Sequence, residues 1–177
     1  ALTLYTEVVV SPTSDSESIL CVRLESDSES WVSFGISPTG LMFGANAIIG
    51  NAAYDSVQKY NSTLDVTKQK PFAAMDETHQ TLMNTGPFAP MEDDHQTLMN
   101  TKVTQEDGKT VVSFSKYLKE EGEHEIFAEG ENRFLWAVGP ASNALGYHSA
   151  RGEITLDLKA TAAAPSFDLK VGDEVCI

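Results

Sequence analysis

Apolar and polar residues alternate along most of the chain with a period of two. In SILCVRLES (18–26), Leu20, Val22 and Leu24 fall on one face of an extended strand, and WVSFGIS (31–37) alternates in the same way. This alternation is typical of half-buried β-strands. Similar patterns, rich in β-branched and aromatic residues, predict further strands at 2–10, 45–50, 53–60, 132–139 and 152–160.

Turn residues separate these segments at regular intervals. KVTQEDGKTVVSFSK (102–116) is a candidate hairpin with Asp107-Gly108 at its turn, and two SDSES repeats (14–18 and 26–30) are polar turns. No stretch shows a helical stripe with caps. Many short strands with frequent turns predict an all-β fold, an antiparallel β-sandwich of two packed sheets. The length of 177 residues fits one domain, residues 1–177.

A tandem duplication interrupts the strand pattern. PFAAMDETHQTLMNTG (71–86) is followed by PFAPMEDDHQTLMNTK (87–102), and eleven of the sixteen aligned positions are identical. Two copies cannot bury a continuous core, so we expect a duplicated loop insertion at 71–102 within the single domain. Thioethers and imidazoles in both copies also make a copper site conceivable, with candidate ligands Met75, His79, Met83, Met91, His95 and Met99.

The charge of the chain limits its partners. The net charge is −14, from 26 acidic and 12 basic residues, so nucleic acid and anionic membrane surfaces are poor partners. A basic protein would be attracted, although the charge also serves solubility alone. No long apolar run is present, so we expect no direct insertion of this domain into a membrane.

Several features predict an extracellular location. The chain starts at Ala1 without an apolar leader, as a processed secreted protein or a trimmed chain would. Cys21 and Cys176 are too few and too far apart for a thiolate metal site, so a disulfide is predicted, with two unpaired thiols as the alternative. A single glycosylation sequon, at Asn61, agrees weakly with secretion.

Two loops carry candidate chemistry. SPTGLMFGAN (37–46) places Met42 among large apolar residues in a turn, and LGYHSARG (145–152) places His148 in a polar loop. Taken singly, Met42 would be a core plug and His148 a solvated side chain. Each loop follows a predicted strand, however, and parallel strands would bring both loops to one end of the sandwich. A thioether facing an imidazole is a suitable pair of axial ligands for a haem iron.

WVSFGISPTGLMFGANAIIG, with FLWAVGPASNALGYHSARGEITLDL much later, resembles a DOMON domain of the cytochrome branch. Cellobiose dehydrogenase cytochrome domains and plant DOMON proteins related to cytochrome b561 belong to that branch. The resemblance covers about residues 8–158 and leaves out the duplication. It implies an immunoglobulin-like β-sandwich of roughly ten strands, holding haem b through Met42 and His148. The family also has members that bind sugars or no haem.

The resemblance implies roles for residues near the two ligands. Arg151 would pair with a haem propionate, and Tyr147 would stack on the ring or donate its hydroxyl. Phe43 and Trp136 would form the apolar wall. The alternatives are a surface salt bridge for Arg151 and core packing for the two aromatic residues.

A six-coordinate Met/His haem transfers one electron and leaves no position open for substrate. We therefore expect an electron-transfer domain rather than an enzyme, with a redox protein or a membrane cytochrome as its partner. The chain lacks the Gly-x-Ser-x-Gly, HExxH and P-loop motifs. The alternatives are a haem-free module for carbohydrate binding or adhesion, and a carrier of copper or another metal. EEGEHEIFAEGE (120–131), with His124, is expected to be a solvated acidic loop.

Overall fold

The computed structural model describes residues 1–11, 17–62, 88–141 and 143–159. Within these ranges the chain forms ten β-strands in two antiparallel sheets, which confirms the predicted all-β sandwich of roughly ten strands. The helical turns in the described ranges are too short and too polar to cross a bilayer.

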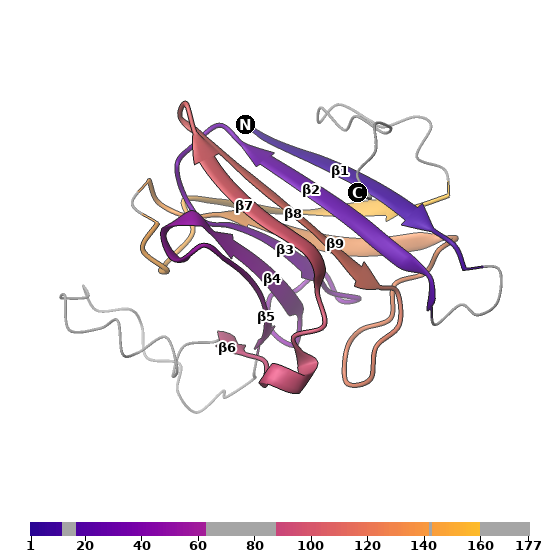
Figure 1. Cartoon of the computed structure of the whole chain (residues 1–177). Helices are drawn as coiled ribbons and strands as arrows, with labels where there is room; N and C mark the ends of the chain where they lie inside the picture. The colour runs from indigo at the N-terminus through magenta and orange to yellow at the C-terminus, as the bar shows by residue number, and fades with distance from the viewer. Residues whose placement is uncertain (12–16, 63–87, 142, 160–177) are drawn as a thin grey trace.

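The smaller sheet has four strands in the order β1-β2-β8-β7. Their alternating apolar residues point toward the other sheet, as the period of two requires. A turn at Asp107-Gly108 joins β7 to β8, as the sequence predicts. Figure 1 shows the four strands running diagonally side by side. Their bounds are β1 (Leu2–Val9), β2 (Ile19–Ser26), β7 (Met99–Glu106) and β8 (Lys109–Tyr117).

The larger sheet has six strands in the order β10-β9-β3-β4-β5-β6. Every neighbouring pair is antiparallel. The strands are β3 (Val32–Ile36), β4 (Asn46–Asn51), β5 (Ser56–Ser62), β6 (Phe88–Pro90), β9 (Glu131–Val138) and β10 (Ala150–Asp157).

The second copy of the duplication is part of the sandwich and not a loop. It supplies β6, the 3₁₀ turn η5 (Asp93–His95) and the start of β7. Met91 is buried, and its backbone amide donates to the Lys59 carbonyl of β5. The expected loop insertion at 71–102 is therefore corrected for residues 88–102, which pair with both sheets. The first copy lies outside the described residues.

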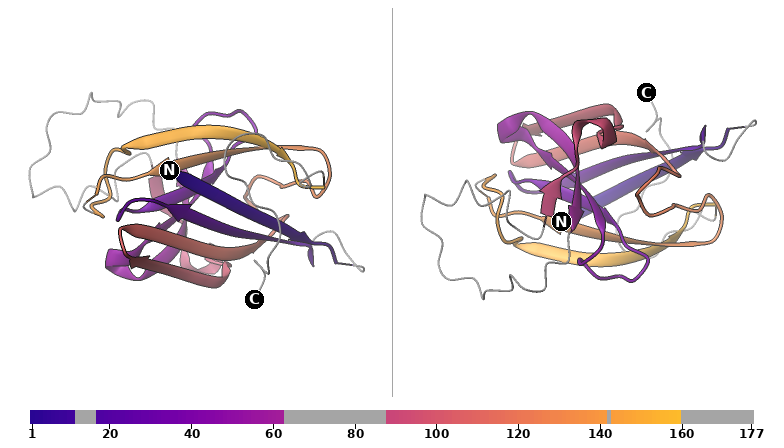
Figure 2. Two further views of the ribbon diagram at one scale, coloured as in Figure 1. Left: turned by 90° about the horizontal axis from the view of Figure 1, so that it is seen from above. Right: turned by 90° about the horizontal axis from the view of Figure 1, so that it is seen from below.

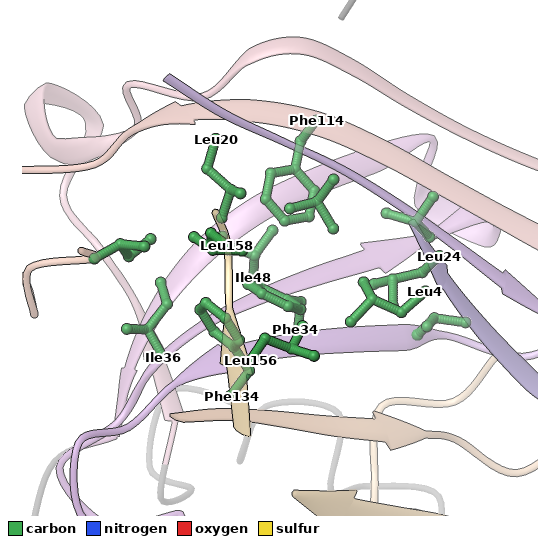
Figure 3. Packing of buried hydrophobic residues seen from close by; sticks show 14 of the residues in the cluster. Leu4, Leu20, Leu24, Phe34, Ile36, Ile48, Phe114, Phe134, Leu156 and Leu158 are labelled. Carbon is green, nitrogen blue, oxygen red and sulfur yellow. The ribbon is translucent and has the colours of Figure 1, made fainter. Parts of the chain in front are cut away.

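The core lies between the two sheets. Its centre is Phe34, whose ring centroid is 4.9 Å from that of Phe134 and 5.9 Å from that of Phe114 in the facing sheet (Figure 3). Aliphatic side chains from both sheets, including Leu20 and Ile48, surround these rings and are almost fully buried. The core thus fixes which face of each strand points inward, and by exclusion which face points outward.

The sandwich has two ends. At the first, which we call the Met42 end, β3 stops and β9 starts, and the loops 37–45 and 118–130 meet. At the second, the His148 end, β3 starts and β9 stops, and the loops 27–31 and 139–149 meet. Figure 2 shows the two sheets as layers, with the start of β1 beside β9 and β10 at one edge.

Replacing Gly50 by alanine is expected to destabilise the protein. Gly50 lies on the inner side of β4, and a Cβ atom there would come within 2.6 Å of Val112 Cγ1 in the facing sheet. Overpacking of this kind costs about 1–3 kcal/mol, so urea unfolding should show a lowered midpoint. The control is Gly146→Ala, because a Cβ there meets only the Ala144 carbonyl at 3.9 Å. Equal midpoints for the two variants would contradict the close sheet contact.

Candidate functional site

The loops carrying Met42 and His148 lie at opposite ends of the sandwich. Strands β3 and β9, which precede them, are antiparallel, with Val32 opposite Val138 and Ile36 opposite Phe134. The expectation of parallel strands, with both loops at one end, is therefore wrong. A ligand that took one donor from each loop would have to lie between the two ends of the sandwich.

Both loops border the same outer face of the larger sheet. Phe34 and Phe134 point into the core, so the neighbouring positions Gly35 and Leu135 face outward. Six outer positions of β3, β4 and β9 are small or aliphatic, and they are Ser33, Gly35, Ala47, Ile49, Leu135 and Ala137. The remaining outer positions of these strands are polar or charged, and they are Asn51, Glu131 and Arg133.

A second apolar cluster covers part of this outer face. Trp31, Ala47, Ile49 and Tyr60 are its buried members, packed with Ala137 and Leu145. Burial raises the pKa of the Tyr60 phenol. Buried aromatic side chains outside the main core show that this face is built to be covered. We call it the outer cluster.

The Met42 loop is a tight turn that leans over this face. The Gly40 amide donates to the Ser37 carbonyl, the Ala45 amide donates to the Met42 carbonyl, and both Gly40 and Gly44 have positive φ. A Cβ atom on Gly40 would lie 2.5 Å from Glu153 Oε2 on β10, so the turn contacts the outer side of the sheet. Met42 itself is half-buried.

Two large apolar side chains of this turn face solvent. Leu41 is 62% exposed and Phe43 is 39% exposed. Exposed apolar side chains beside an apolar face are typical of a binding surface. Phe43, predicted as part of an apolar wall, therefore stands at the rim of the outer face, at the Met42 end.

The His148 loop is fixed by hydrogen bonds to both sheets. The Trp31 indole Nε1 donates to the Ala144 carbonyl at 3.0 Å, and Asn51 Nδ2 donates to the Asn143 carbonyl at 2.9 Å. The Asn143 side chain also exchanges hydrogen bonds with Gln105 of β7. His148 is thus presented by an ordered loop.

Tyr147, His148 and Arg151 are brought together, as the sequence predicts. His148 Nε2 lies 3.4 Å from Arg151 Nη1, and the Tyr147 and His148 ring centroids are 4.4 Å apart. A guanidinium only donates, so Nε2 is the acceptor nitrogen in this contact and bears the lone pair. Arg151 pairs with Ala137, an outward position, and His148 is half-buried. The lone pair of His148 Nε2 is therefore directed at Arg151 beside the outer face, and a metal would have to displace this contact.

Trp136 does not lie with these residues. It shares the inward parity of Phe134 on β9, and a Cβ on Gly152 of β10 would come within 2.6 Å of its ring. Its ring lines a cavity of about 320 Å³ between the edges of β1 and β10. Trp136 thus lies on the inner side of β9, away from the outer face, and its role as a wall of a ligand site stays a prediction. Trp31 and Tyr60 are the buried aromatic residues of the outer face. The period-two alternation of 132–139 already separates Trp136 from the outward positions.

The two loops leave the larger sheet at well separated points. The Ser37 amide donates to the Arg133 carbonyl, and the Ser149 amide donates to the Val138 carbonyl. Arg133 and Val138 are separated by five strand positions, which corresponds to roughly 17 Å. Met42 supplies a thioether and His148 an imidazole, which are donor types that a haem iron accepts.

Buried ion pairs hold the loop beside the Met42 turn. Lys59 Nζ lies 2.8 Å from Glu120 Oε1 and 2.6 Å from Glu123 Oε1, and Lys116 Nζ lies 2.7 Å from Glu120 Oε2. Thr97 hydrogen-bonds Glu120 as well. The expectation of a fully solvated acidic loop at 120–131 is corrected, because Glu123, Lys59 and Lys116 are at most 2% exposed. We call these four charged residues the buried charge cluster.

The pH dependence of stability is expected to reflect Glu120. Burial disfavours its charged form, but the Lys116 ammonium and hydrogen bonds from Lys116, Lys59 and Thr97 hold its pKa below the ordinary value of 4.5. Its contribution to the free energy of unfolding is therefore present above pH 4.5 and is lost as the pH falls through the lowered pKa. Urea midpoints between pH 7 and pH 3 should fall less steeply in Glu120→Gln than in wild type. Glu121→Gln, at an exposed position, is the control and should follow wild type.

Other predicted features have mixed outcomes. Cys21 is buried and is not a free thiol, and Ser115 Oγ lies 3.4 Å from its Sγ. Cys176 lies outside the described residues, so the pairing stays a prediction. Asn61 Oδ1 accepts a hydrogen bond from Asn46, and Thr63 of its sequon lies outside the described residues. Within the described ranges, no three His, Cys, Asp or Glu residues form a metal-binding group.

The copper prediction is tested only in part. Met75, His79 and Met83 lie outside the described residues, while His95 is exposed and Met91 is buried. No protein-family model and no curated protein matches the chain. The resemblance to DOMON domains therefore depends on the two loop motifs of the sequence alone and stays a prediction.

Proposed function

We propose that this protein is an extracellular b-type cytochrome domain that transfers single electrons. The observation that carries the proposal is that Met42 and His148 lie on loops at opposite ends of one apolar outer face. A ligand standing on that face would receive one axial donor from each loop. The fold alone would not favour this function over sugar binding.

Named residues would hold the haem. Met42 Sδ and His148 Nε2 would be the axial ligands, and Arg151 would pair with a propionate. Phe43, Tyr147 and the aromatic members of the outer cluster would exclude water from the ring. When bound, haem b supplies a one-electron carrier, and two protein ligands leave no position for substrate. The domain would thus serve a redox enzyme or a membrane cytochrome and would not be an enzyme by itself.

Absorption spectra of the purified protein test this proposal. Wild type is expected to take up haem and to show Soret and α bands that sharpen with dithionite. Met42→Ala and His148→Ala should each lose the six-coordinate spectrum of the reduced protein, because one axial donor is removed. His95→Ala is the control, because His95 is exposed on η5 and far in sequence from both loops. Wild type that stays colourless after addition of haem would overturn the proposal.

The proposed extracellular location agrees with the state of Cys21. Its sulfur is buried in β2 and is not a free thiol. We propose Cys176, the other cysteine of the chain, as its disulfide partner, which an oxidising compartment would permit. Thiol counting on the denatured protein, before and after reduction, tests the pairing. Two thiols before reduction would contradict it.

A further inference from the structure

A histidine from another loop contacts the turn that carries Met42. His124, in the loop 118–130, places Nε2 at 2.6 Å from the Gly44 carbonyl oxygen. Its backbone amide donates to Asn46 Oδ1 at 2.7 Å. A carbonyl only accepts, so His124 Nε2 carries the proton in this bond. Two hydrogen bonds from one residue thus join the loop to the turn and to the start of β4.

The loop that carries His124 is itself firmly anchored. The neighbouring residue, Glu123, is ion-paired with Lys59 and Lys116 in the buried charge cluster. The Ile126 amide donates to the Leu118 carbonyl at 2.8 Å, and both side chains are buried in the main core. His124 is therefore attached to a rigid part of the sandwich.

The Met42 turn, in contrast, is weakly held by its own packing. Leu41 and Phe43, on either side of Met42, are largely exposed, and Gly44 has φ of +79°. The Ala45 amide closes the turn by donating to the Met42 carbonyl at 3.2 Å. Because Gly44 lies between Met42 and Ala45, a bond to its carbonyl restrains the closing of the turn directly.

We infer that His124 is a positioning residue that fixes the Met42 turn above the outer face. The buried charge cluster anchors the loop that carries His124, and the hydrogen bond from His124 in turn restrains a turn whose apolar side chains are exposed. The consequence for haem ligation rests on the proposed function, whereas the restraint on the turn does not.

Hydrogen exchange of the haem-free protein tests the restraint. In His124→Ala, the Ala45 amide is expected to exchange about tenfold faster than in wild type, as the loss of one hydrogen bond implies. His124→Gln should restore most of the protection, because its amide nitrogen reaches the place of the imidazole Nε2. His95→Ala is the matched control and should behave as wild type. Unchanged protection of Ala45 in His124→Ala would overturn the inference.

The haem-loaded protein tests the consequence for ligation. His124→Ala should shift the midpoint potential and weaken the six-coordinate spectrum, and His124→Gln should restore both. A wild-type spectrum and potential in His124→Ala would overturn the role in ligation. If wild type binds no haem, the proposed function fails, and hydrogen exchange alone then decides whether His124 positions the turn.

Discussion

Replacing Lys116 by alanine should lower the free energy of unfolding by about 3–5 kcal/mol, as removal of one partner from a buried ion pair typically does. The Lys116 side chain is fully buried, and its ammonium lies within 4 Å of both Glu120 and Glu123. Lys59 alone would then face two carboxylates in a site with little water. Urea unfolding at pH 7 measures the effect.

Two further variants separate charge from packing. Lys116→Met keeps most of the buried side chain and should lose nearly as much stability as Lys116→Ala. Lys119→Ala removes a lysine that is 60% exposed and paired with Glu125 at 3.4 Å, and it should cost less than about 0.5 kcal/mol. A loss below about 1 kcal/mol for Lys116→Ala would mean that the cost of burying the cluster offsets its internal attraction.

The sequence already indicates that the side chain of Lys116 points inward, but it does not indicate which residues pair with it. In β8, Val112, Phe114 and Lys116 share one parity, so the apolar alternation already places Lys116 on the core face. An apolar pattern cannot say which acidic residues meet a buried lysine. That depends on how the loop 118–130 closes over the end of the sheets, which involves contacts between distant parts of the chain.

The strands were predictable and the strand directions were not. Period-two alternation depends on local contact with one core, so nine of the ten described strands follow from it, all except β6. Whether β3 and β9 are parallel depends on pairing between segments about a hundred residues apart, and no local pattern encodes it. The wrong relative direction of β3 and β9 led to the expectation that Met42 and His148 lie at the same end of the sandwich. In the structure their loops lie at opposite ends and border the same outer face.

The second copy of the duplication shows how a repeated segment can become part of the sheets. Two nearly equal segments suggested one loop insertion, yet the second copy forms β6 and the start of β7. The second copy follows β5 and precedes the hairpin of β7 and β8 in the chain. Its residues 88–90 can therefore pair with the edge of β5.

Replacing Trp31 by alanine should cost about 3–5 kcal/mol, the usual effect of truncating a buried aromatic side chain. Trp31 is only 5% exposed although it lies outside the main core. Its ring packs against Gly139, where a Cβ would come within 2.5 Å of Trp31 Cε2, and its indole holds Ala144. The variant should therefore also free the His148 loop, and the Ser149 amide, bonded to Val138, should lose protection from exchange.

Comparison with two other variants identifies the cause. Trp31→Phe keeps most of the ring and loses the bond to Ala144, so it should cost only about 0.5–1.5 kcal/mol. Trp136→Ala, at the partly exposed wall of the cavity beside β1, should cost less than Trp31→Ala and leave Ser149 protected. If Trp136→Ala proved the more damaging in urea unfolding, the outer cluster would not be a second core. The His148 loop would then be held by the contacts of Asn143 and by the hydrogen bonds of Gly139 and Ser149, and the face between the two loops would have no rigid aromatic wall.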